Sequence, residues 1–464
     1  MTQSSLAEAA AASAEPTARL AKDLRQRHVA MISIGGIIGA GLFVGSSAGI
    51  ATIGPAVVVS YLLAGVVVLL VMRMLGEMAA AYPEVGAFTE YARLGLGNWA
   101  GFTAGWLYWY FWVVVVAFEA LTGALVVQPW IGLPIWVIAL GLVGLMLVTN
   151  LWSTKSYGEF EFWFASIKVA AIIAFIILCA GFLTLHHAAP GGRFVNLTGH
   201  GGFAPFGSLA VLSGVTSVIF QLTGAEIATI AAAESDEPGR AIARMTSQVV
   251  VRILLFYVVS LFLIVTIIPW TSVHKGVSPF VTTLESIGIP AAPFVMKLII
   301  LTAVLSCLNS GLYVTSRVLF TLAAKGDAPK ALVALNARKV PVRAILFATG
   351  FAIVAGAASV VEPTHVWAFL LDASGALMLI VYGIVALAQI RLRGKLEREA
   401  PERLTVRMWF YPVGSWFAVA TIVAILAAMA FSSGQRTEFG ASLVVLLIAL
   451  AAFFAFRRNA PRVA

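Results

Sequence analysis

The chain has 464 residues, of which 61% are hydrophobic and only 11% are charged. This composition excludes an ordinary soluble domain and indicates a protein that crosses a membrane several times. The formal net charge of +9 does not indicate nucleic-acid binding, because Lys and Arg also collect in the cytosolic loops of membrane proteins.

Common catalytic and metal-binding patterns are absent from the sequence. The two cysteines, Cys179 and Cys307, both lie in apolar runs, so neither a disulfide framework nor a thiolate metal site is predicted. The sequence contains no HExxH, no GxSxG and no Walker-type glycine loop. We therefore expect no metal, no cofactor and no enzymatic activity.

The chain begins with a polar tail. Residues 1–18 are rich in Ala and Ser, carry Glu8 and Glu15, and have no apolar core. This composition is typical of a disordered tail rather than a cleaved signal peptide. We place the tail at residues 1–24, on the cytosolic side.

The first long apolar segment contains the run GGIIGAG at residues 35–41. Each glycine inside a helix costs about 1 kcal/mol relative to alanine, so a break in the helix is predicted here. The half-helix that begins near Ala40 and Gly41 would direct free amides at a ligand carboxylate. The carbonyls released near Ile37 would suit an ammonium group. Together the two ends predict a site for a zwitterion.

Apolar runs long enough to cross the roughly 30 Å hydrocarbon layer predict twelve spans. Their ranges are 28–52, 55–79, 99–127, 131–151, 160–185, 206–233, 246–270, 291–322, 343–361, 365–390, 407–431 and 437–457. With the N-terminus in the cytosol, 25 of the 30 Lys and Arg residues lie in or beside cytosolic loops. Only Arg193, Lys275 and Arg436 lie outside, while Lys168 and Lys297 lie within spans. This distribution predicts that both termini are cytosolic.

The sixth span carries the second predicted break. It begins near Pro205, contains Gly214 and Gly224, and places Gln221 and Glu226 near mid-membrane. Interrupted helices at corresponding positions of two halves indicate an inverted-repeat transporter. Spans one to five and six to ten are therefore the predicted repeats.

Five ordered motifs resemble the bacterial amino-acid permeases of the amino acid–polyamine–organocation superfamily. They are SIGGIIGAGLFVGS, GEMAAAYPEVGAFTEYA, KSYGEFEFWFASIKV, TGAEIATIAAAESDEP and SCLNSGLYVTSRVLFTLAAKGDAPK, within a resemblance that covers about residues 25–455. Within that family, the chain is most similar to the gamma-aminobutyrate permease branch. Gly41 departs from it, since serine is expected there, which leaves the fine selectivity open.

The resemblance implies an all-α membrane protein with twelve helices. Its LeuT-like core has five plus five helices with discontinuous helices 1 and 6, and helices 11 and 12 are added after it. The implied core spans residues 25–392, with repeats at about 28–185 and 206–390, and residues 393–464 hold the last two helices and the C-terminus.

The resemblance also implies proton-coupled uptake of an amino acid by alternating access, with the proton gradient as the driving force. By motif position, the amides of Ala40 and Gly41 hold the substrate carboxylate. The carbonyls of Ile37 and Thr223 face the ammonium group, and Phe220 covers the ligand.

Two charged residues within spans are candidates for proton coupling. Lys168 either extends to the interface or places its ammonium group at the opened carbonyls of span one and the hydroxyls of span eight, where sodium-driven relatives bind their ion. A fixed cation there repels sodium, and a buried lysine can exchange its proton during a cycle. Glu226 either binds freed backbone amides or takes part in coupling.

Other polar residues are weaker candidates for the site. Glu119 either lies beside the ligand amine or packs against a neighbouring span, and we expect it to line the site. Gly39, in the glycine run, and Ser306, in span eight, are expected to line the same cavity. Small polar residues are also ordinary packing contacts between membrane helices. Asp372 is expected to cap span ten at the outer face.

The sequence therefore predicts a transporter of the bacterial inner membrane, with both termini cytosolic. Its partners are an amino acid, protons and the lipid bilayer, and its oligomeric state is left open. The predicted substrates are gamma-aminobutyrate and related omega-amino acids. The alternatives are a permease for an alpha-amino acid such as proline, alanine or an aromatic residue, and an exchanger or sensor on the same fold.

Overall fold

The computed structural model describes residues 38–82, 88–152, 154–185, 192–224, 226, 253–357 and 363–456. Within these ranges the regular structure is entirely helical. The predicted N-terminal tail, the start of the first span and the segment after Glu226 lie outside the described residues. In the first half of the chain the helices are η1 (Gly41–Gly45), α3 (Ser46–Ile53), η2 (Gly54–Ala56), α4 (Val57–Ala81), α5 (Phe88–Leu96), α6 (Asn98–Ile131), α7 (Ile135–Trp152) and α8 (Thr154–Leu185).

The described part of the second half also consists of helices of very different lengths. The helices are α9 (Val195–Thr198), α10 (Gly207–Ser213), α11 (Val215–Leu222), η3 (Ile253–Val259), α14 (Ser260–Ile267), η4 (Trp270–Ser272), α15 (Pro279–Ile287), α16 (Ala292–Ala324), η5 (Lys330–Val333), α17 (Val342–Ala357), α18 (Pro363–Glu399), η7 (Pro401–Arg403), α19 (Val413–Phe431) and α20 (Arg436–Phe456).

Eight helical stretches among the described residues are long and apolar enough to cross a membrane. They are Gly41–Ala81, Asn98–Ile131, Ile135–Trp152, Glu159–Leu185, Ala292–Ala324, Ala373–Glu399, Val413–Phe431 and Arg436–Ala455, and three shorter apolar helices cover Gly207–Leu222, Leu255–Ile267 and Val342–Val354. The first stretch bends at Gly54, whose φ of 77° ends α3, and Pro55 then helps to start the next turn. It therefore holds two of the predicted spans, one on each side of the bend.

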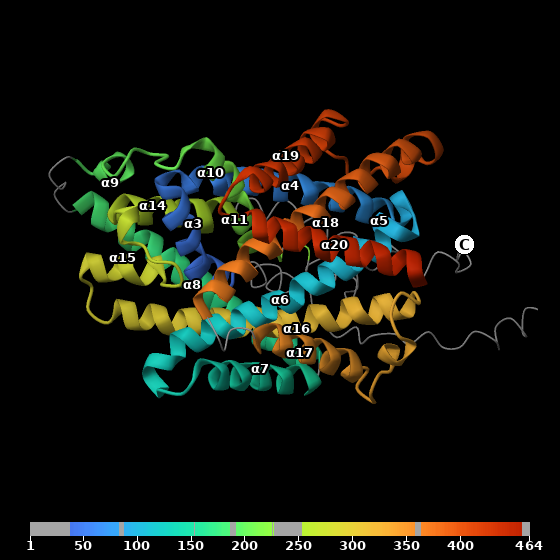
Figure 1. Cartoon of the computed structure of the whole chain (residues 1–464), viewed down its shortest axis with the longest axis horizontal. Coiled ribbons are helices and arrows are strands. Elements are labelled where there is room, and N and C mark those ends of the chain that lie inside the picture. The colour runs from blue at the N-terminus through green and yellow to red at the C-terminus, as the bar shows by residue number, and fades with distance from the viewer. Residues whose placement is uncertain are drawn as a thin grey trace, which may run out of the picture.

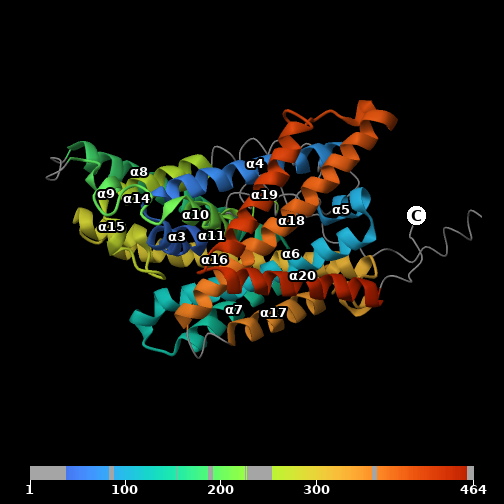
Figure 2. The same cartoon turned by 45° about the horizontal axis from the view of Figure 1, so that its top comes forward.

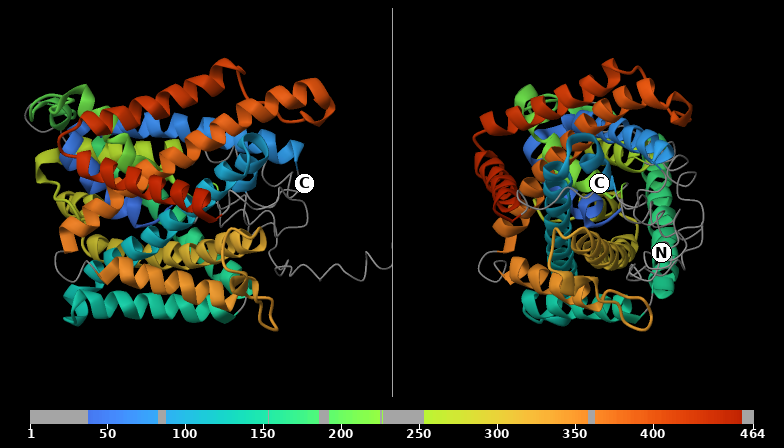
Figure 3. Two further views of the ribbon diagram at one scale, coloured as in Figure 1. Left: turned by 45° about the vertical axis from the view of Figure 1, so that its right-hand side comes forward. Right: turned by 90° about the vertical axis from the view of Figure 1, so that its right-hand side faces the viewer.

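The long helices lie side by side along one axis of the molecule (Figure 1). The short helices α9 and α15 lie at one end, which we call the α15 end, and α5 lies at the other, the α5 end. Helices α7 and α17 pack together on one flank (Figure 2). Viewed close to the long axis, the helices form a closely packed bundle (Figure 3).

Helix α6 lies in the middle of this bundle, against α16, α18 and α5. Its residues are apolar on nearly every side, which is typical of a helix surrounded by other helices. It ends at Gly132, whose left-handed conformation (φ 72°) closes the helix. Because α6 touches so many helices, side chains on it can reach several parts of the core.

A buried ionic network joins three segments at the α5 end. The carboxylate of Glu77, in α4, accepts hydrogen bonds from the Arg393 guanidinium and from Gln389 Nε2 at 2.6 Å, both in α18. It also accepts one from the backbone N–H of Met408 at 2.6 Å, and Ser415 in α19 donates to Gln389 Oε1 at 2.8 Å. These bonds connect α4, α18 and the start of α19.

We expect Glu77→Gln to lower the thermal stability of the purified protein by several degrees. Removing one partner of a buried ion pair costs about 3–5 kcal/mol when the other charge is left unpaired, and this is an upper bound here because Arg393 keeps its pair with Glu397 at 2.8 Å. The measurement is the midpoint of heat-induced loss of the monodisperse peak in detergent. Glu399→Gln is the control, because Glu399 pairs with Lys395 at the surface, where such pairs contribute little. Equal midpoints for the two variants would contradict the prediction.

Candidate functional site

A small polar cavity lies between the start of the first helix and the end of α11. Its volume is about 20 Å³. Five of the residues that line it are predicted site residues: Gly39, Gly41, Glu119, Phe220 and Thr223. The other lining residues are Phe111, Trp112, Val115, Gln221 and Cys307. The structure therefore brings together predicted site residues from three separate helical segments.

The first helix begins at Ala40, after two residues that are bent rather than helical. This start agrees with the predicted break, and the residues before Ile38, including the predicted carbonyl at Ile37, lie outside the described residues. The backbone N–H of Ala40 donates to both carboxylate oxygens of Glu119, at 3.1 and 3.2 Å. A helix N-terminus attracts negative charge because its amides are free and its dipole is positive there. The Ala40 amide, which was predicted to bind the substrate carboxylate, thus binds the side chain of Glu119 instead.

This position of Glu119 was not predicted, although its place in the cavity lining was. Glu119 is almost fully buried on α6 and lies against Gly39. A Cβ atom added at Gly39 would lie 2.5 Å from Glu119 Oε1 and 2.9 Å from Cys307 Sγ. Residue 39 must therefore be glycine for the carboxylate to reach the helix.

The end of α11 agrees with the second predicted break. Helix α11 ends at Leu222, Thr223 is extended (φ −67°, ψ 144°), and Gly224 has a φ of 126° that favours glycine. The carboxylate of Glu226 accepts from the N–H of Gly224 at 3.1 Å. This bond is the backbone-binding role that was one of the two interpretations of Glu226, and a coupling role stays a prediction.

Two tyrosines also bind the Glu226 carboxylate. Tyr108 of α6 donates to Oε1 at 3.3 Å, and Tyr382 of α18 donates to Oε2 at 3.1 Å. Neither tyrosine is among the site residues predicted from the sequence. Their partner could be identified only from the packing of α6, α11 and α18.

Gln221 connects α11 to α4 and η3. Its side-chain oxygen accepts a hydrogen bond from Tyr61 of α4, and its backbone carbonyl accepts one from Tyr257 of η3 at 3.0 Å. A Cβ atom at Gly41 would lie 3.1 Å from Gln221 Cγ and 3.2 Å from its Cα. A serine at position 41, as expected in similar permeases, would require Gln221 to shift by a few tenths of an ångström. Glycine rather than serine at position 41 thus allows Gln221 to lie this close to the helix.

Lys168 makes the contacts that the sequence predicts for it. From α8, its fully buried ammonium group donates to the carbonyl of Ile38 at 2.7 Å and to Ser306 Oγ of α16 at 2.8 Å. The interpretation that it extends to the membrane interface is therefore wrong. Its role in coupling stays a prediction.

Glu161 is a buried charged residue beside Lys168 that was not predicted from the sequence. Ser306 Oγ donates to Glu161 Oε1 at 2.5 Å, and Lys168 Nζ lies 4.0 Å from the same oxygen. All of these side chains are fully buried. A signal was present, because residues seven apart lie on the same face of a helix, two turns from each other.

The remaining predictions concern Ser306 and Asp372. Ser306 contacts Lys168 and Glu161 and is not among the residues that line the small cavity. Asn309, its neighbour, accepts hydrogen bonds from Thr149 and Asn150 of α7, an ordinary packing contact between helices. Asp372 lies within α18, and its side chain lies outside the described residues.

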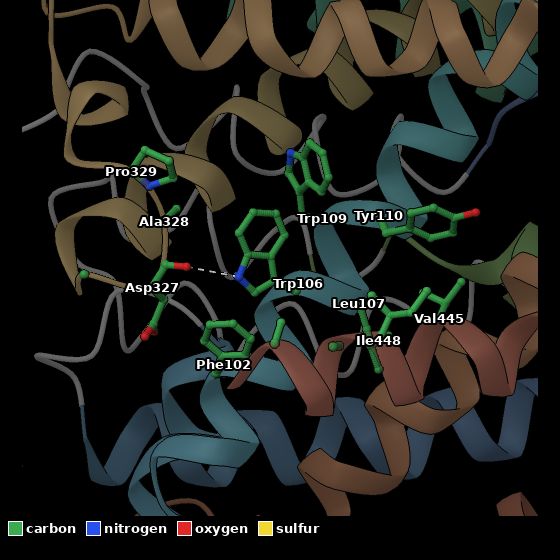
Figure 4. Close-up of a pocket in the computed structure, with 13 residues that line it drawn as sticks. Phe102, Trp106, Leu107, Trp109, Tyr110, Asp327, Ala328, Pro329, Val445 and Ile448 are labelled. Atoms are coloured by element: carbon green, nitrogen blue, oxygen red, sulfur yellow. Dashed lines mark hydrogen bonds between the residues drawn. The ribbon is translucent and has the colours of Figure 1, made fainter. Parts of the chain in front are cut away.

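A larger cavity of about 540 Å³ lies elsewhere, between α6, α20 and the loop after α16 (Figure 4). Trp106, Trp109 and Tyr110 line it with several aliphatic side chains, and the indole of Trp106 donates to the backbone oxygen of Asp327 at 3.1 Å. Apolar walls offer few partners for an ammonium or a carboxylate group, and burying unpaired charges is costly. The small polar cavity is therefore the better site for a zwitterion.

Comparisons with known proteins show which family the chain belongs to. Residues 28–462 match the sequence profile of the amino acid permease family. A gamma-aminobutyric acid permease of Bacillus subtilis (strain 168) is 47% identical over 95% of this chain and 94% of its own length. An aromatic amino acid transport protein of Corynebacterium glutamicum is 39% identical over 90% of this chain and 91% of its own length.

The fold is also similar to that of a solved membrane transporter. The manganese transporter of Eremococcus coleocola superposes with a TM-score of 0.52 over 93% of each chain, at 12% sequence identity. At this identity the likeness concerns the fold alone. The profile match over nearly the whole chain, together with the identity to the permeases, shows that this multi-pass membrane protein belongs to the amino acid permease family.

Proposed function

We propose that the protein is a secondary active transporter that takes up gamma-aminobutyrate and related omega-amino acids together with protons. The observation that carries this proposal is the small cavity between a helix start at Ala40 and the end of α11, with a helix N-terminal amide on one side and a buried ammonium group close by. The 47% identity to a gamma-aminobutyric acid permease supports the choice of substrate. Uptake would proceed across the bacterial inner membrane by alternating access.

We propose twelve membrane crossings in this fold. The eight long apolar stretches and the three shorter apolar helices lie where the twelve spans are predicted. The interrupted segments near Ala40 and Leu222 support a LeuT-like core of two inverted five-helix repeats, about 28–185 and 206–390. Helices α19 and α20 would then be the two additional crossings, and both termini would be cytosolic.

Substrate binding would use the backbone atoms at the two breaks. The amides of Ala40 and Gly41 would bind the substrate carboxylate, and the carbonyls of Ile37 and Thr223 would bind its ammonium group. For this to occur, the Glu119 carboxylate must leave the Ala40 amide. Released from that contact, it would lie in the same cavity as a partner for the substrate amine.

The cavity must also enlarge before a substrate can enter. Its volume of about 20 Å³ has room for about one water molecule, which needs roughly 10–15 Å³, and is too small for an amino acid. Phe220 packs against Phe111 and Phe118, with ring centroids 5.8 and 4.9 Å apart. Movement of the Phe220 ring, the proposed lid, would open this space.

Lys168 would couple substrate movement to the proton gradient, with Glu226 as a second candidate. The ammonium group of Lys168 lies between the first helix and α16, so it is sensitive to any movement of one against the other. While it is protonated, the ammonium group would repel sodium from this position. The driving force would then be the proton gradient, with no cofactor.

The test is uptake of labelled gamma-aminobutyrate into proteoliposomes with an acidic exterior and the membrane potential clamped at zero. With one proton per substrate, a gradient of one pH unit supports about tenfold accumulation, because one unit corresponds to about 1.4 kcal/mol. Empty liposomes and liposomes treated with a protonophore are the controls. If accumulation is the same with and without the protonophore, proton coupling is contradicted and an exchanger is favoured.

Competition with unlabelled amino acids tests the substrate class in the same vesicles. We expect omega-amino acids to inhibit uptake more strongly than proline, alanine or aromatic amino acids. A permease for alpha-amino acids is the second candidate, and the 39% identity to an aromatic amino acid transport protein is the observation that supports it. Inhibition by alpha-amino acids alone would replace the first substrate class by the second.

A further inference from the structure

Glu161 forms a buried chain of hydrogen bonds with the coupling lysine. Lys168 Nζ donates to Ser306 Oγ at 2.8 Å, and Ser306 Oγ donates to Glu161 Oε1 at 2.5 Å. The ammonium and the carboxylate are 4.0 Å apart, and neither is exposed. A hydroxyl that accepts from one group and donates to the other can pass a proton between them.

We propose that Glu161 is the proton acceptor through which Lys168 releases its proton toward the cytosol. The inference rests on the proposed proton-coupled function and adds a residue and a route to it. In the transfer, one N–H bond of Lys168 breaks and its proton binds Ser306 Oγ. The original hydroxyl proton of Ser306 moves to Glu161 Oε1, so Lys168 becomes a neutral amine and Glu161 a neutral carboxylic acid. The number of protons and the net charge of the group are unchanged.

The position of Glu161 along α8 sets the direction of release. It lies seven residues before Lys168, or about 10 Å nearer the start of the helix at 1.5 Å per residue. In the proposed topology α8 begins at the cytosolic surface, so Glu161 is the inner of the two groups. Its carboxylate is fully buried here. Release to the cytosol therefore requires a conformation in which water reaches the first turns of α8.

The groups around the pair favour transfer between these two residues. Lys168, from the same helix, and Ser306 and Ser310, from α16, face the Glu161 carboxylate. Glu119 of α6 and Cys307 of α16 face the ammonium group, together with Glu161 itself. Glu119 binds the Ala40 amide, whereas Glu161 receives a hydrogen bond from the hydroxyl that also binds Lys168. Glu161 is therefore the carboxylate with a direct path to the lysine.

The test is Glu161→Gln in proteoliposomes. Glutamine keeps an oxygen that accepts from Ser306 but cannot take up a proton at pH 7. Under a gradient of one pH unit that gives about tenfold accumulation in the wild type, we expect the variant only to equilibrate gamma-aminobutyrate. Substrate-induced proton entry, followed with an internal pH dye, should be lost. Counterflow against preloaded substrate needs no net proton movement and should continue, with a KM close to that of the wild type.

Two further variants make the result specific. Glu159→Gln changes a partly exposed carboxylate on the same helix, two residues away, and should accumulate substrate like the wild type. Glu161→Asp retains the acid and should restore part of the accumulation and of the proton entry.

Three outcomes are distinguishable. Accumulation and proton entry by Glu161→Gln at wild-type levels would overturn the inference and leave the proposed function intact. Loss of counterflow together with accumulation, in a monodisperse variant, would also overturn it, since Glu161 would then only position Lys168. Absence of proton-driven accumulation in the wild type would instead contradict the proposed function.

Discussion

Lys168→Ala is expected to abolish concentrative uptake of gamma-aminobutyrate. Alanine removes the ammonium group that bonds the Ile38 carbonyl and Ser306, and with it the group proposed to exchange the proton. Under a gradient of one pH unit, where the wild type would accumulate substrate about tenfold, internal and external concentrations should at most become equal. The measurement is labelled uptake at steady state in proteoliposomes.

Two companion variants separate coupling from folding. Lys168→Ala leaves Glu161 without its ion pair in the core, which costs about 3–5 kcal/mol. The double variant Lys168→Met, Glu161→Gln removes both charges and keeps the side-chain volume, so it should be more stable and equally unable to accumulate substrate. Lys297→Ala is the matched control on a partly exposed lysine of α16 and should transport normally. Full accumulation by Lys168→Ala would remove the proposed coupling role.

Gly39→Val is expected to eliminate substrate binding. The valine Cβ alone would lie 2.5 Å from Glu119 Oε1 and 2.9 Å from Cys307 Sγ, and its methyl groups need further space in a cavity of about 20 Å³. The expected loss of affinity for gamma-aminobutyrate is about 100-fold or more, equivalent to about 3 kcal/mol. The measurement is equilibrium binding of labelled substrate to the purified protein.

The matched control is Gly141→Val on α7, where an added Cβ atom meets nothing within 4 Å. It should bind and transport like the wild type. Gly39→Ala is the milder variant, and we expect an intermediate affinity if it folds like the wild type. Unchanged affinity in a folded Gly39→Val protein would place the ligand site elsewhere.

The helix start at Ala40 and the end of α11 were predictable from the sequence because their cause is local. The glycine run before Ala40 and the glycine after Thr223 make helical backbone costly at those positions, whatever surrounds them. The described helix starts at Ala40 and α11 ends at Leu222, next to these glycines. The contacts of Lys168 were predicted from the motifs that resemble known permeases rather than from spacing.

The partners of the buried acids were not predictable in the same way. Glu119 lies 79 residues from Ala40 along the chain, and Glu77 lies 316 residues from Arg393. Such pairs depend on how helices pack, and the sequence of one helix does not specify the neighbour that each face meets. Glu161 is different, since its position two turns before Lys168 on the same helix was visible in the sequence.

The contact between Glu119 and the Ala40 amide has a consequence for inhibitors. Any carboxylate compound aimed at that amide competes with an acid that the protein carries itself, and whose effective concentration is fixed by α6. A measured inhibition constant would therefore reflect the difference in binding free energy between the inhibitor carboxylate and the Glu119 carboxylate at that amide. Compounds that also offer the displaced side chain a cationic partner should gain most in potency.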